Sequence, residues 1–399
     1  MRILLLSHGY HPTISGVTHV VRKQALALLN HGHQVAVVTA SDSGRPYVGD
    51  DNGLTIIRIR STHNPYWSEG PLPWITRPGL RNIIDEYQPD LIHTHENALL
   101  SIQLTRIKQG LAQPLIASCY SFPEFGAHYL PQKLGIVDRV CSALWRYLIW
   151  NLNQYDHVVC ATQIHLDILQ KHGFQRESSI ISNGVNTKRY SPQNGQLMDI
   201  ERQYNLPPRP RILFVGRLAR DKNLSILIES MTAIRTRCPA HLLIVGRGNQ
   251  RLSLEKLAKR LGLENSVHFL GFVPEADLPS LYRQVDLFAM VSVCETQNIP
   301  TLQALATGLP AVVTKAGALP ELVTHGVNGY QVQPGDPQAV SQAALKILMD
   351  TEKAHRFGLA SLEVGRAHGE SRSFQDLDDL YKRLLRKREP QLQTQPSAA

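Results

Sequence analysis

The sequence has no long apolar run and few cysteines. No stretch approaches the roughly 20 apolar residues that a helix needs to cross a bilayer, and the first one, residues 3–6, is too short for the core of a signal peptide. We therefore expect a cytoplasmic protein. The 5 cysteines are odd in number, lie far apart and form no Cys-x-x-Cys pair, which argues against a disulfide framework and a zinc site.

The composition indicates a globular protein of two domains. Of the 399 residues, 43% are hydrophobic and 19% are charged, as in folded chains, and the length exceeds what one hydrophobic core usually supports. The formal net charge of +9 favours an anionic partner, such as a phosphorylated ligand, an anionic lipid or nucleic acid. Because no helix-turn-helix, zinc-finger or RNA-binding aromatic signature is present, we expect no nucleic-acid partner. Nothing in the sequence bears on the oligomeric state.

Short apolar runs alternate with helical stretches in both halves of the chain, a pattern typical of parallel sheets covered by helices on both faces. The polar, proline-containing residues 186–210 separate the halves and are typical of a linker. We therefore predict an α/β protein with two doubly wound, Rossmann-like domains, residues 1–185 and 186–372. A terminal helix at 373–388 is predicted to cross back to the first domain, followed by a disordered tail at 389–399. The predicted strands are residues 3–7, 34–39, 56–59, 91–93, 115–117 and 158–161, and then 212–215, 242–245, 267–270, 287–290 and 311–314.

Three segments with chemically useful residues follow predicted strands, where doubly wound sheets bind their ligands. Gly16 opens a helix after the first strand, and a glycine at a helix N-terminus lets a phosphate approach the backbone. Arg217 and Lys222 follow the first strand of the second domain, and a guanidinium beside an ammonium suits a diphosphate. Glu295 follows a later strand, where it can bind sugar hydroxyls, and the N–H groups near Asn298 at the next helix start favour phosphate. An ordinary turn, a solvated basic loop and a capping acid are the structural alternatives.

Six short stretches of the second half, taken in order, resemble motifs of one enzyme family. They are similar to its P-N-G-V-D, V-G-R-L-x-x-x-K-G, V-G-x-G, V-x-F-x-G, E-x7-E and A-M-A-x-G-x-P motifs. The family is that of the retaining glycosyltransferases of family 4 (group 1), which includes sucrose synthase-like, mannosyl- and glycolipid glucosyltransferases. The resemblance implies the GT-B fold, in which two Rossmann-like domains face a cleft, and a nucleotide-diphosphate sugar as donor. The stretches are residues 182–186, 215–223, 244–248, 267–271, 295–303 and 304–310.

The resemblance also implies roles for single residues of the second half. Arg217 and Lys222 would bind the donor diphosphate, and Glu295 would hold hydroxyls of the transferred sugar. Two positions depart from the family pattern. Gln303 replaces the acid that usually binds the ribose diol, which puts donor choice and affinity in question. Asn298 replaces a glycine, and because asparagine tolerates left-handed backbone angles, we expect the loop conformation to be kept. The other implied contacts are of sugar and phosphate with the backbone of Asn298, Ile299 and Pro300, of the nucleobase with His268, Phe269 and Leu270, and of phosphate with Gly16.

The first half carries two similarities to the same family. Residues 90–95 are similar to D-x-x-H-x-H, and the resemblance places His95 near the reacting carbon of the donor sugar, whereas a histidine at a strand end is by itself more often structural. Residues 117–125 resemble the S-Y-H-T-x-F-P-E-Y of glycolipid-making members, with one residue missing and Tyr120 in place of a histidine. Tyr120 and Ser121 are therefore the expected acceptor-side residues.

The resemblance implies a front-face transfer that retains the anomeric configuration. The leaving diphosphate, held by the two cations, would take the proton of the acceptor hydroxyl. No carboxylate pair for a double displacement and no Asp-x-Asp motif stand out, so we predict no covalent intermediate, no metal ion and no cofactor. A UDP- or GDP-hexose is the expected donor, with the sugar, base and linkage left open.

The acceptor is predicted to be a membrane lipid or a lipid-linked glycan. Residues 135–155 combine Trp145 and Trp150 with Arg139 and Arg146, which suits the surface of an anionic membrane, and the basic residues 382–388 agree with this. We therefore expect peripheral contact with the inner face of the cell membrane, although a helix packed in its own domain explains residues 135–155 equally well. A soluble or polysaccharide acceptor, a sugar-nucleotide epimerase of the same fold and a catalytically inactive sugar-nucleotide-binding protein are the alternatives.

Overall fold

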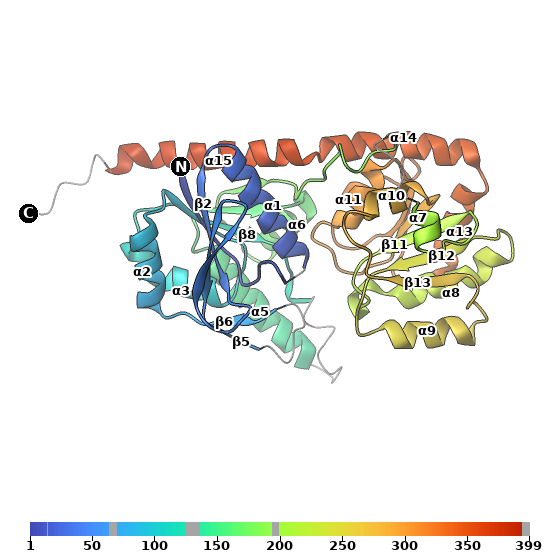
Figure 1. Cartoon of the computed structure of the whole chain (residues 1–399), viewed down its shortest axis with the longest axis horizontal. Helices are drawn as coiled ribbons and strands as arrows, with labels where there is room; N and C mark the ends of the chain where they lie inside the picture. The colour runs from blue at the N-terminus through green and yellow to red at the C-terminus, as the bar shows by residue number, and fades with distance from the viewer. Residues whose placement is uncertain (14, 64–69, 125–135, 194–198, 393–399) are drawn as a thin grey trace, which may run out of the picture. The chain divides into compact units, whose positions relative to one another are not determined.

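The computed structural model describes residues 1–13, 15–63, 70–124, 136–193 and 199–392, without the side chains of residues 136 and 388–392. The chain forms two compact units (Figure 1). Unit 1 contains Met1–Pro123, residues 136–182 and the chain from Arg372, and unit 2 contains Asn183–Ser371. Each unit is built around one sheet.

The sheet of unit 1 has 8 strands in the order β10-β9-β8-β7-β1-β2-β4-β3. All neighbours pair in parallel except β3, which runs antiparallel to β4 at the edge. The expectation of a parallel sheet is therefore correct except for β3, a short polar strand joined to β4 by a tight turn at Asn52 and Gly53, both with positive φ. The strands are β1 Arg2–Leu6, β2 Gln34–Ala40, β3 Tyr47–Asp51, β4 Leu54–Ile59, β7 Leu91–Thr94, β8 Leu115–Cys119, β9 His157–Cys160 and β10 Ser178–Ile180; β5 Ser61–Thr62 and β6 Leu72–Pro73 form a separate pair.

The C-terminal helix α15, Glu370–Leu392, packs on the sheet of unit 1. Leu377, Leu380 and Tyr381 are buried in one cluster with side chains of the β1 and β2 strands and of α1, and Figure 1 shows α15 beside α1 and β2. Burying each leucine contributes about 1.5–3 kcal/mol, so the helix is held mainly by these contacts. It is longer than the predicted 373–388, so residues 389–392 are helical rather than a disordered tail; residues 393–399 lie outside the described part. The other helices of unit 1 are α1 Gly16–Asn30, α2 Arg77–Tyr87, α3 Leu99–Ile107, the 3-10 helix η1 Lys108–Gly110, α5 Ile136–Leu152 and α6 Gln163–Lys171.

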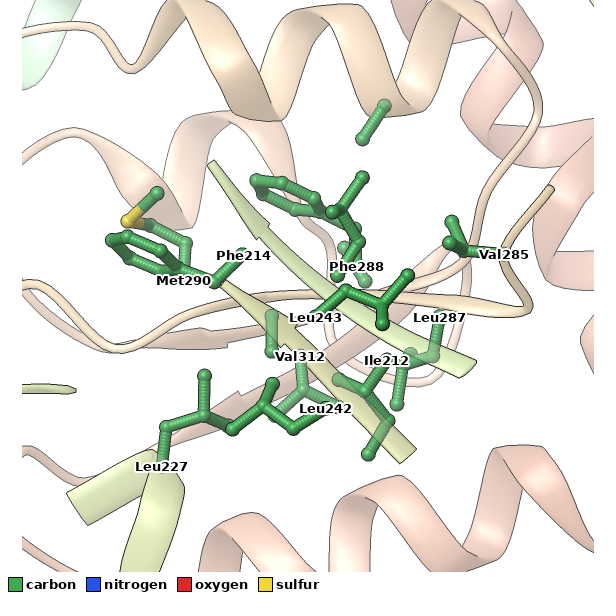
Figure 2. Close-up of a cluster of buried hydrophobic side chains, with 14 of the residues drawn as sticks. Ile212, Phe214, Leu227, Leu242, Leu243, Val285, Leu287, Phe288, Met290 and Val312 are labelled. Atoms are coloured by element: carbon green, nitrogen blue, oxygen red, sulfur yellow. The ribbon is translucent and has the colours of Figure 1, made fainter. Parts of the chain in front are cut away.

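The sheet of unit 2 has 6 parallel strands in the order β13-β12-β11-β14-β15-β16. Successive residues such as Leu242 and Leu243 are both fully buried because helices cover both faces, and Figure 2 shows side chains from neighbouring strands packed together in this core. The strands are β11 Arg211–Val215, β12 His241–Val245, β13 Val267–Gly271, β14 Leu287–Met290, β15 Ala311–Thr314 and β16 Gly329–Val332; the helices are α7 Ile200–Gln203, η2 Arg220–Lys222, α8 Leu224–Arg235, α9 Arg251–Arg260, α10 Leu278–Arg283, α11 Ile299–Ala306, α12 Leu319–Leu322, α13 Pro337–Leu348 and α14 Thr351–Ala367.

The predicted linker, residues 186–210, is part of unit 2. Tyr190 and Ile200 are buried in its core, and the ring of Tyr190 packs edge-on against Tyr282 at 5.8 Å between centroids. The linker interpretation is therefore wrong for these residues, because the polar and proline-rich composition conceals two core side chains. Of the segment, residues 194–198 lie outside the described part.

No helix among the described residues is long and apolar enough to span a bilayer.

Candidate active site

Three of the predicted site residues meet in unit 2, at the carboxyl ends of β11 and β14. The Lys222 ammonium lies 2.7 Å from Glu295 Oε1 and 3.1 Å from Asp221 Oδ2. The Arg217 guanidinium lies 3.6 Å from the other oxygen of Asp221. Because β11 and β14 are neighbours in the sheet, the loops that follow them come together. The result is a compact cluster of two cations and two carboxylates.

The environment keeps Lys222 charged. Burial alone would lower the pKa of Lys222, but the carboxylates of Glu295 and Asp221 outweigh burial and raise it above its ordinary value. Arg217 is the more accessible cation, with 39% of its side chain exposed against 15% for Lys222. Sequence reasoning missed Asp221, whose position between Arg220 and Lys222 in a basic loop gives no sign that its side chain turns inward.

Backbone contacts fix the loop that carries Glu295. The Glu295 carbonyl accepts from the Ala318 N–H at 2.9 Å. A Cβ on Gly317, which has φ +51°, would lie 2.3 Å from the same carbonyl, so only glycine fits there. The loop after β15 therefore supports the loop after β14 and leaves the Glu295 carboxylate little freedom.

Asn298 is the N-cap of α11 and is not left-handed. Its φ of −88° and ψ of 103° are extended, and its Oδ1 accepts from the N–H and the hydroxyl of Thr301 at 2.8 and 2.7 Å. The expectation that asparagine stands here for its left-handed tolerance is thus wrong, because the side chain is needed as a cap. Ile299 and Pro300 form the first turn, so a helix begins where the sequence predicts one.

Gln303 is buried on α11 next to Tyr282. The Tyr282 hydroxyl lies 3.1 Å from both Gln303 Oε1 and the Pro300 carbonyl. The Tyr282 hydroxyl has one proton and can donate to only one of these two oxygens. If it donates to the Pro300 carbonyl, the amide of Gln303 can be turned so that its nitrogen donates to the Tyr282 oxygen and its own oxygen faces away from Tyr282. In that orientation the oxygen of Gln303 is free of Tyr282 and remains an acceptor.

The three predicted base-contacting residues of β13 divide into two groups. The His268 ring lies 3.1 Å from the ring of His241, the first residue of β12, so its side chain points toward the amino end of the strands and away from the cluster. The Phe269 ring lies 5.9 Å from the Arg251 guanidinium, on the loop side, and Leu270 is half-buried. Sequence reasoning missed Arg251 and Arg247; the latter lies over the exposed ring of Phe272 at 5.4 Å.

Two glycines bring the loops after β11 and β12 into backbone contact. A Cβ on Gly246 would lie 1.9 Å from the Gly216 carbonyl, and one on Gly248 would lie 2.2 Å from the Leu218 carbonyl. The V-G-x-G resemblance therefore has a physical reason here, because any side chain would separate the loops.

In unit 1, His95 directly follows β7 and is 2% exposed. The backbone N–H of His95 donates to the Leu6 carbonyl at 2.7 Å. In the side chain, Nδ1 lies 3.1 Å from the Tyr120 hydroxyl, and the ring packs on that of His93 at 4.1 Å between centroids. Burial lowers the pKa of His95 to about 3, so the ring is neutral. Its Nε2 is buried and has no hydrogen-bond partner among the residues that the structure describes.

Of the other residues predicted for unit 1, Tyr120 joins His95, whereas the Ser121 side chain is exposed. Gly16 is the first residue of α1, where Ser15 and Thr18 form a capping box. A Cβ on Gly16 would have no atom within 4 Å, so the space at this helix start is open. Sequence reasoning missed Glu96, whose buried carboxyl accepts from two backbone N–H groups and whose pKa burial raises to about 7.

Comparison with known proteins identifies the family. The model described as Glycosyltransferase Family 4 matches residues 14–189, and that described as Glycosyl transferases group 1 matches residues 199–363. Over 373 residues the chain is 32% identical to the GDP-mannose-dependent alpha-(1-6)-phosphatidylinositol monomannoside mannosyltransferase of Mycobacterium tuberculosis, covering 91% of this chain and 93% of that protein. The chain belongs to glycosyltransferase family 4.

This family 4 glycosyltransferase has further relatives of the glycolipid type. It is 25% identical over 335 residues to alpha-monoglucosyldiacylglycerol synthase of Streptococcus pneumoniae, which covers 82% of this chain and 74% of that protein. Sucrose-phosphate synthase of Thermosynechococcus elongatus has the same fold, with a TM-score of 0.80 at 22% identity over 97% of this chain and 99% of that one. The predicted GT-B fold is confirmed.

Proposed function

We propose that this glycosyltransferase moves a hexose from a UDP- or GDP-sugar to a hydroxyl of a membrane lipid or lipid-linked glycan, with retention of the anomeric configuration. The observation that carries the proposal is the cluster in which Lys222 bridges Asp221 and Glu295 beside Arg217. It combines cations suited to a diphosphate with a carboxylate suited to sugar hydroxyls. The M. tuberculosis relative is named as GDP-mannose-dependent, which supports a nucleotide-sugar donor.

In the proposed reaction, the bond between the anomeric carbon and the diphosphate oxygen breaks while the acceptor oxygen bonds to the same face of that carbon. The acceptor proton passes to a phosphate oxygen of the departing nucleotide. Arg217 and Lys222 stabilise the negative charge that develops on the diphosphate, and Glu295 orients the hexose through its hydroxyls. We further propose that Gly16, His95 and the backbone of Asn298 to Pro300 contact the donor, with Phe269, Leu270 and the backbone of His268 near the base.

We also propose that the reaction needs no metal ion, because the two side-chain cations supply the positive charge that a divalent ion would otherwise bring. Among the described residues, no group of three His, Cys, Asp or Glu side chains is arranged to hold a metal. Turnover that persists in excess EDTA is the expected result, and loss of turnover that Mg²⁺ or Mn²⁺ restores would contradict this part of the proposal.

The lipid acceptor is supported by the exposed face of α5. Arg139, Arg146 and Trp150 are exposed and recur at intervals of seven and four residues, which places them on one side of the helix. Trp145 is buried and stacks on His172 at 3.7 Å, so only one of the two indoles of the helix is available to a membrane. The exposed indole of Trp150 lies on the same side of α5 as the two arginines, and this combination suits an anionic bilayer surface. The two relatives above carry lipid names.

A donor and acceptor screen tests the function. Purified protein is incubated with UDP-, GDP- and ADP-sugars and a membrane lipid extract, and products are identified by mass and by the anomeric configuration of the new linkage. A hexosylated lipid of retained configuration is expected. An epimerised sugar nucleotide made without acceptor, or transfer only to water-soluble saccharides, would overturn the activity or the lipid acceptor respectively.

A matched pair of variants tests the site. Arg217→Ala should lower turnover by about 100-fold or more, as loss of a donor to transition-state charge does. Arg220→Ala is the control, because Arg220 lies three residues further in the same loop and is exposed. Equal effects of the two substitutions would mean that the basic loop acts only through its net charge.

A further inference from the structure

A chain of polar side chains runs through unit 1 from α15 to His95. The Tyr381 hydroxyl lies 2.6 Å from His93 Nδ1, and His93 Nε2 lies 2.9 Å from the Ser118 hydroxyl. Ser118 hydrogen-bonds to Tyr120, whose hydroxyl lies 3.1 Å from His95 Nδ1. Tyr381, His93 and Ser118 are at most 1% exposed, so the first two hydrogen bonds of the series lie in the core of unit 1.

The number of protons on these side chains fixes which partner donates in each hydrogen bond of the series, starting from Tyr381 on α15. Tyr381 is neutral, since burial raises its pKa well above the ordinary value, and among the described residues His93 is its recorded hydrogen-bond partner. If Tyr381 accepted from His93, its own proton would be left unpaired in the core, at a cost comparable to a lost hydrogen bond. Tyr381 therefore donates to His93 Nδ1. Burial keeps His93 neutral, so its single proton sits on Nε2 and is donated to Ser118.

The second half of the chain follows in the same direction. Because Ser118 accepts from His93, its own proton is free for Tyr120, and Tyr120 also accepts from the amide of Gln24 on α1. The Tyr120 oxygen then accepts two hydrogen bonds and cannot accept a third from His95, so in the contact between the two residues Tyr120 donates to His95 Nδ1. A neutral histidine whose Nδ1 accepts carries its proton on Nε2. That Nε2–H is the buried atom without a partner.

We propose that Tyr381 is a positioning residue which, through His93, Ser118 and Tyr120, holds His95 in the tautomer with the proton on Nε2, so that His95 donates a hydrogen bond to an oxygen of the donor sugar. The inference rests on the proposed function for its ligand. It makes His95 a hydrogen-bond donor and not a general base. A tyrosine hydroxyl can both accept and donate, so Tyr120 can serve at the position where the resembled motif has histidine.

The unpaired Nε2–H selects the ligand chemistry. A buried N–H without an acceptor is rare in folded proteins and is usually explained by a ligand or water. The group that pairs it must present an oxygen lone pair, which a sugar hydroxyl or ring oxygen does. With the chain reversed, the unpaired proton would lie on Tyr381 in the core and His95 would be an acceptor.

The tautomer can be read directly by NMR in the full-length protein labelled with ¹⁵N-histidine. Long-range proton–nitrogen spectra distinguish a protonated from an unprotonated ring nitrogen, and His95→Gln identifies the His95 signals. We expect an unprotonated Nδ1 and a protonated Nε2 for His95. In Tyr381→Phe and in Ser118→Ala, which interrupt the chain at different points, we expect a mixture of tautomers. Tyr155→Phe, which removes a buried hydroxyl bonded to Ser101 in the same unit, should leave the His95 signals unchanged.

Kinetics provide the second readout. Because the net value of one hydrogen bond sets the tautomer bias, Tyr381→Phe should lower turnover of the donor by roughly 2- to 10-fold, with the KM of the acceptor unchanged and Tyr155→Phe without effect. A wild-type His95 protonated on Nδ1, or unaltered His95 signals in both chain variants, would overturn the inference. If the signals behave as expected but no nucleotide sugar is turned over by the wild type, the proposed function fails while the tautomer relay stands.

Discussion

Lys222→Met removes the charge at the centre of the unit 2 cluster while keeping an apolar side chain of similar length. The Asp221 and Glu295 carboxylates then lose their shared ammonium, and their side chains are only 6% and 10% exposed. Breaking a buried ion pair from one side costs about 3–5 kcal/mol, because the remaining charge stays desolvated. With two carboxylates left behind, we expect a loss in the free energy of unfolding near the upper end of this range at pH 8.

Urea unfolding without ligand, followed by circular dichroism at pH 8, measures the effect. The double variant Lys222→Met with Glu295→Gln should recover most of the stability, because it also removes one of the two carboxylates. Lys353→Met is the control, because Lys353 pairs with Asp350 on the surface and should show no measurable change. If Lys222→Met lost no more stability than Lys353→Met, the buried cluster would not exist as described.

Three further substitutions test other parts of the molecule. His165→Phe should raise stability, and more so at pH 5, because both ring nitrogens of His165 are buried without partners among the described residues and burial lowers its pKa from 6.5 to about 3. The wild type should lose about 1.6 kcal/mol of stability as the pH falls from 6.5 to 5 and the variant should not, which urea unfolding at both pH values can check. Gly16→Val should leave the unfolding midpoint unchanged, because the space around a Cβ at Gly16 is open. It should raise the KM of the donor about tenfold or more, because the added side chain would block the proposed approach of the phosphate to this helix start, and an unchanged KM would remove Gly16 from the site. Gln303→Glu should tighten nucleotide binding about 5- to 10-fold in calorimetry, since a charged acceptor forms the stronger hydrogen bond; weaker binding would mean that Gln303 faces the ligand with its nitrogen.

Strands that are apolar on both faces could be predicted from the sequence almost to the residue. The structure has β14 at Leu287–Met290 and β15 at Ala311–Thr314, the ranges that the pattern indicates. Three of the four edge strands of the two large sheets, β3, β10 and β16, could not be predicted, because polar residues or a glycine interrupt their apolar pattern, whereas the fourth, β13, was predicted at 267–270 and spans Val267–Gly271. In β16, Gly329 interrupts the pattern, and it is glycine because a Cβ there would lie 1.9 Å from the Ala311 carbonyl.

The proximity of Arg217, Lys222 and Glu295 could be predicted from the sequence, because all three residues follow strands of one predicted sheet. The direction of a side chain was not predictable. Nothing in the sequence shows that Asp221 turns inward while its neighbour Arg220 stays exposed. The contact between Tyr381 and His93 joins positions 288 residues apart, and only the packing of α15 on the sheet brings them together.

Glu295 and His95 differ in the hydrogen bonds they can make, and this difference allows the proposed contacts of the donor hexose with each residue to be told apart. Glu295, as the partner of the Lys222 ammonium, is a carboxylate that only accepts, whereas His95 in the proposed tautomer only donates. A sugar hydroxyl does both, so it can donate to Glu295 in one unit or accept from His95 in the other. Methylating a hydroxyl removes its proton but keeps its lone pairs, so an O-methyl donor should lose the contact with Glu295 and keep that with His95. A deoxy donor loses either contact, and comparing the two analogues at each ring position therefore assigns every hydroxyl to one unit.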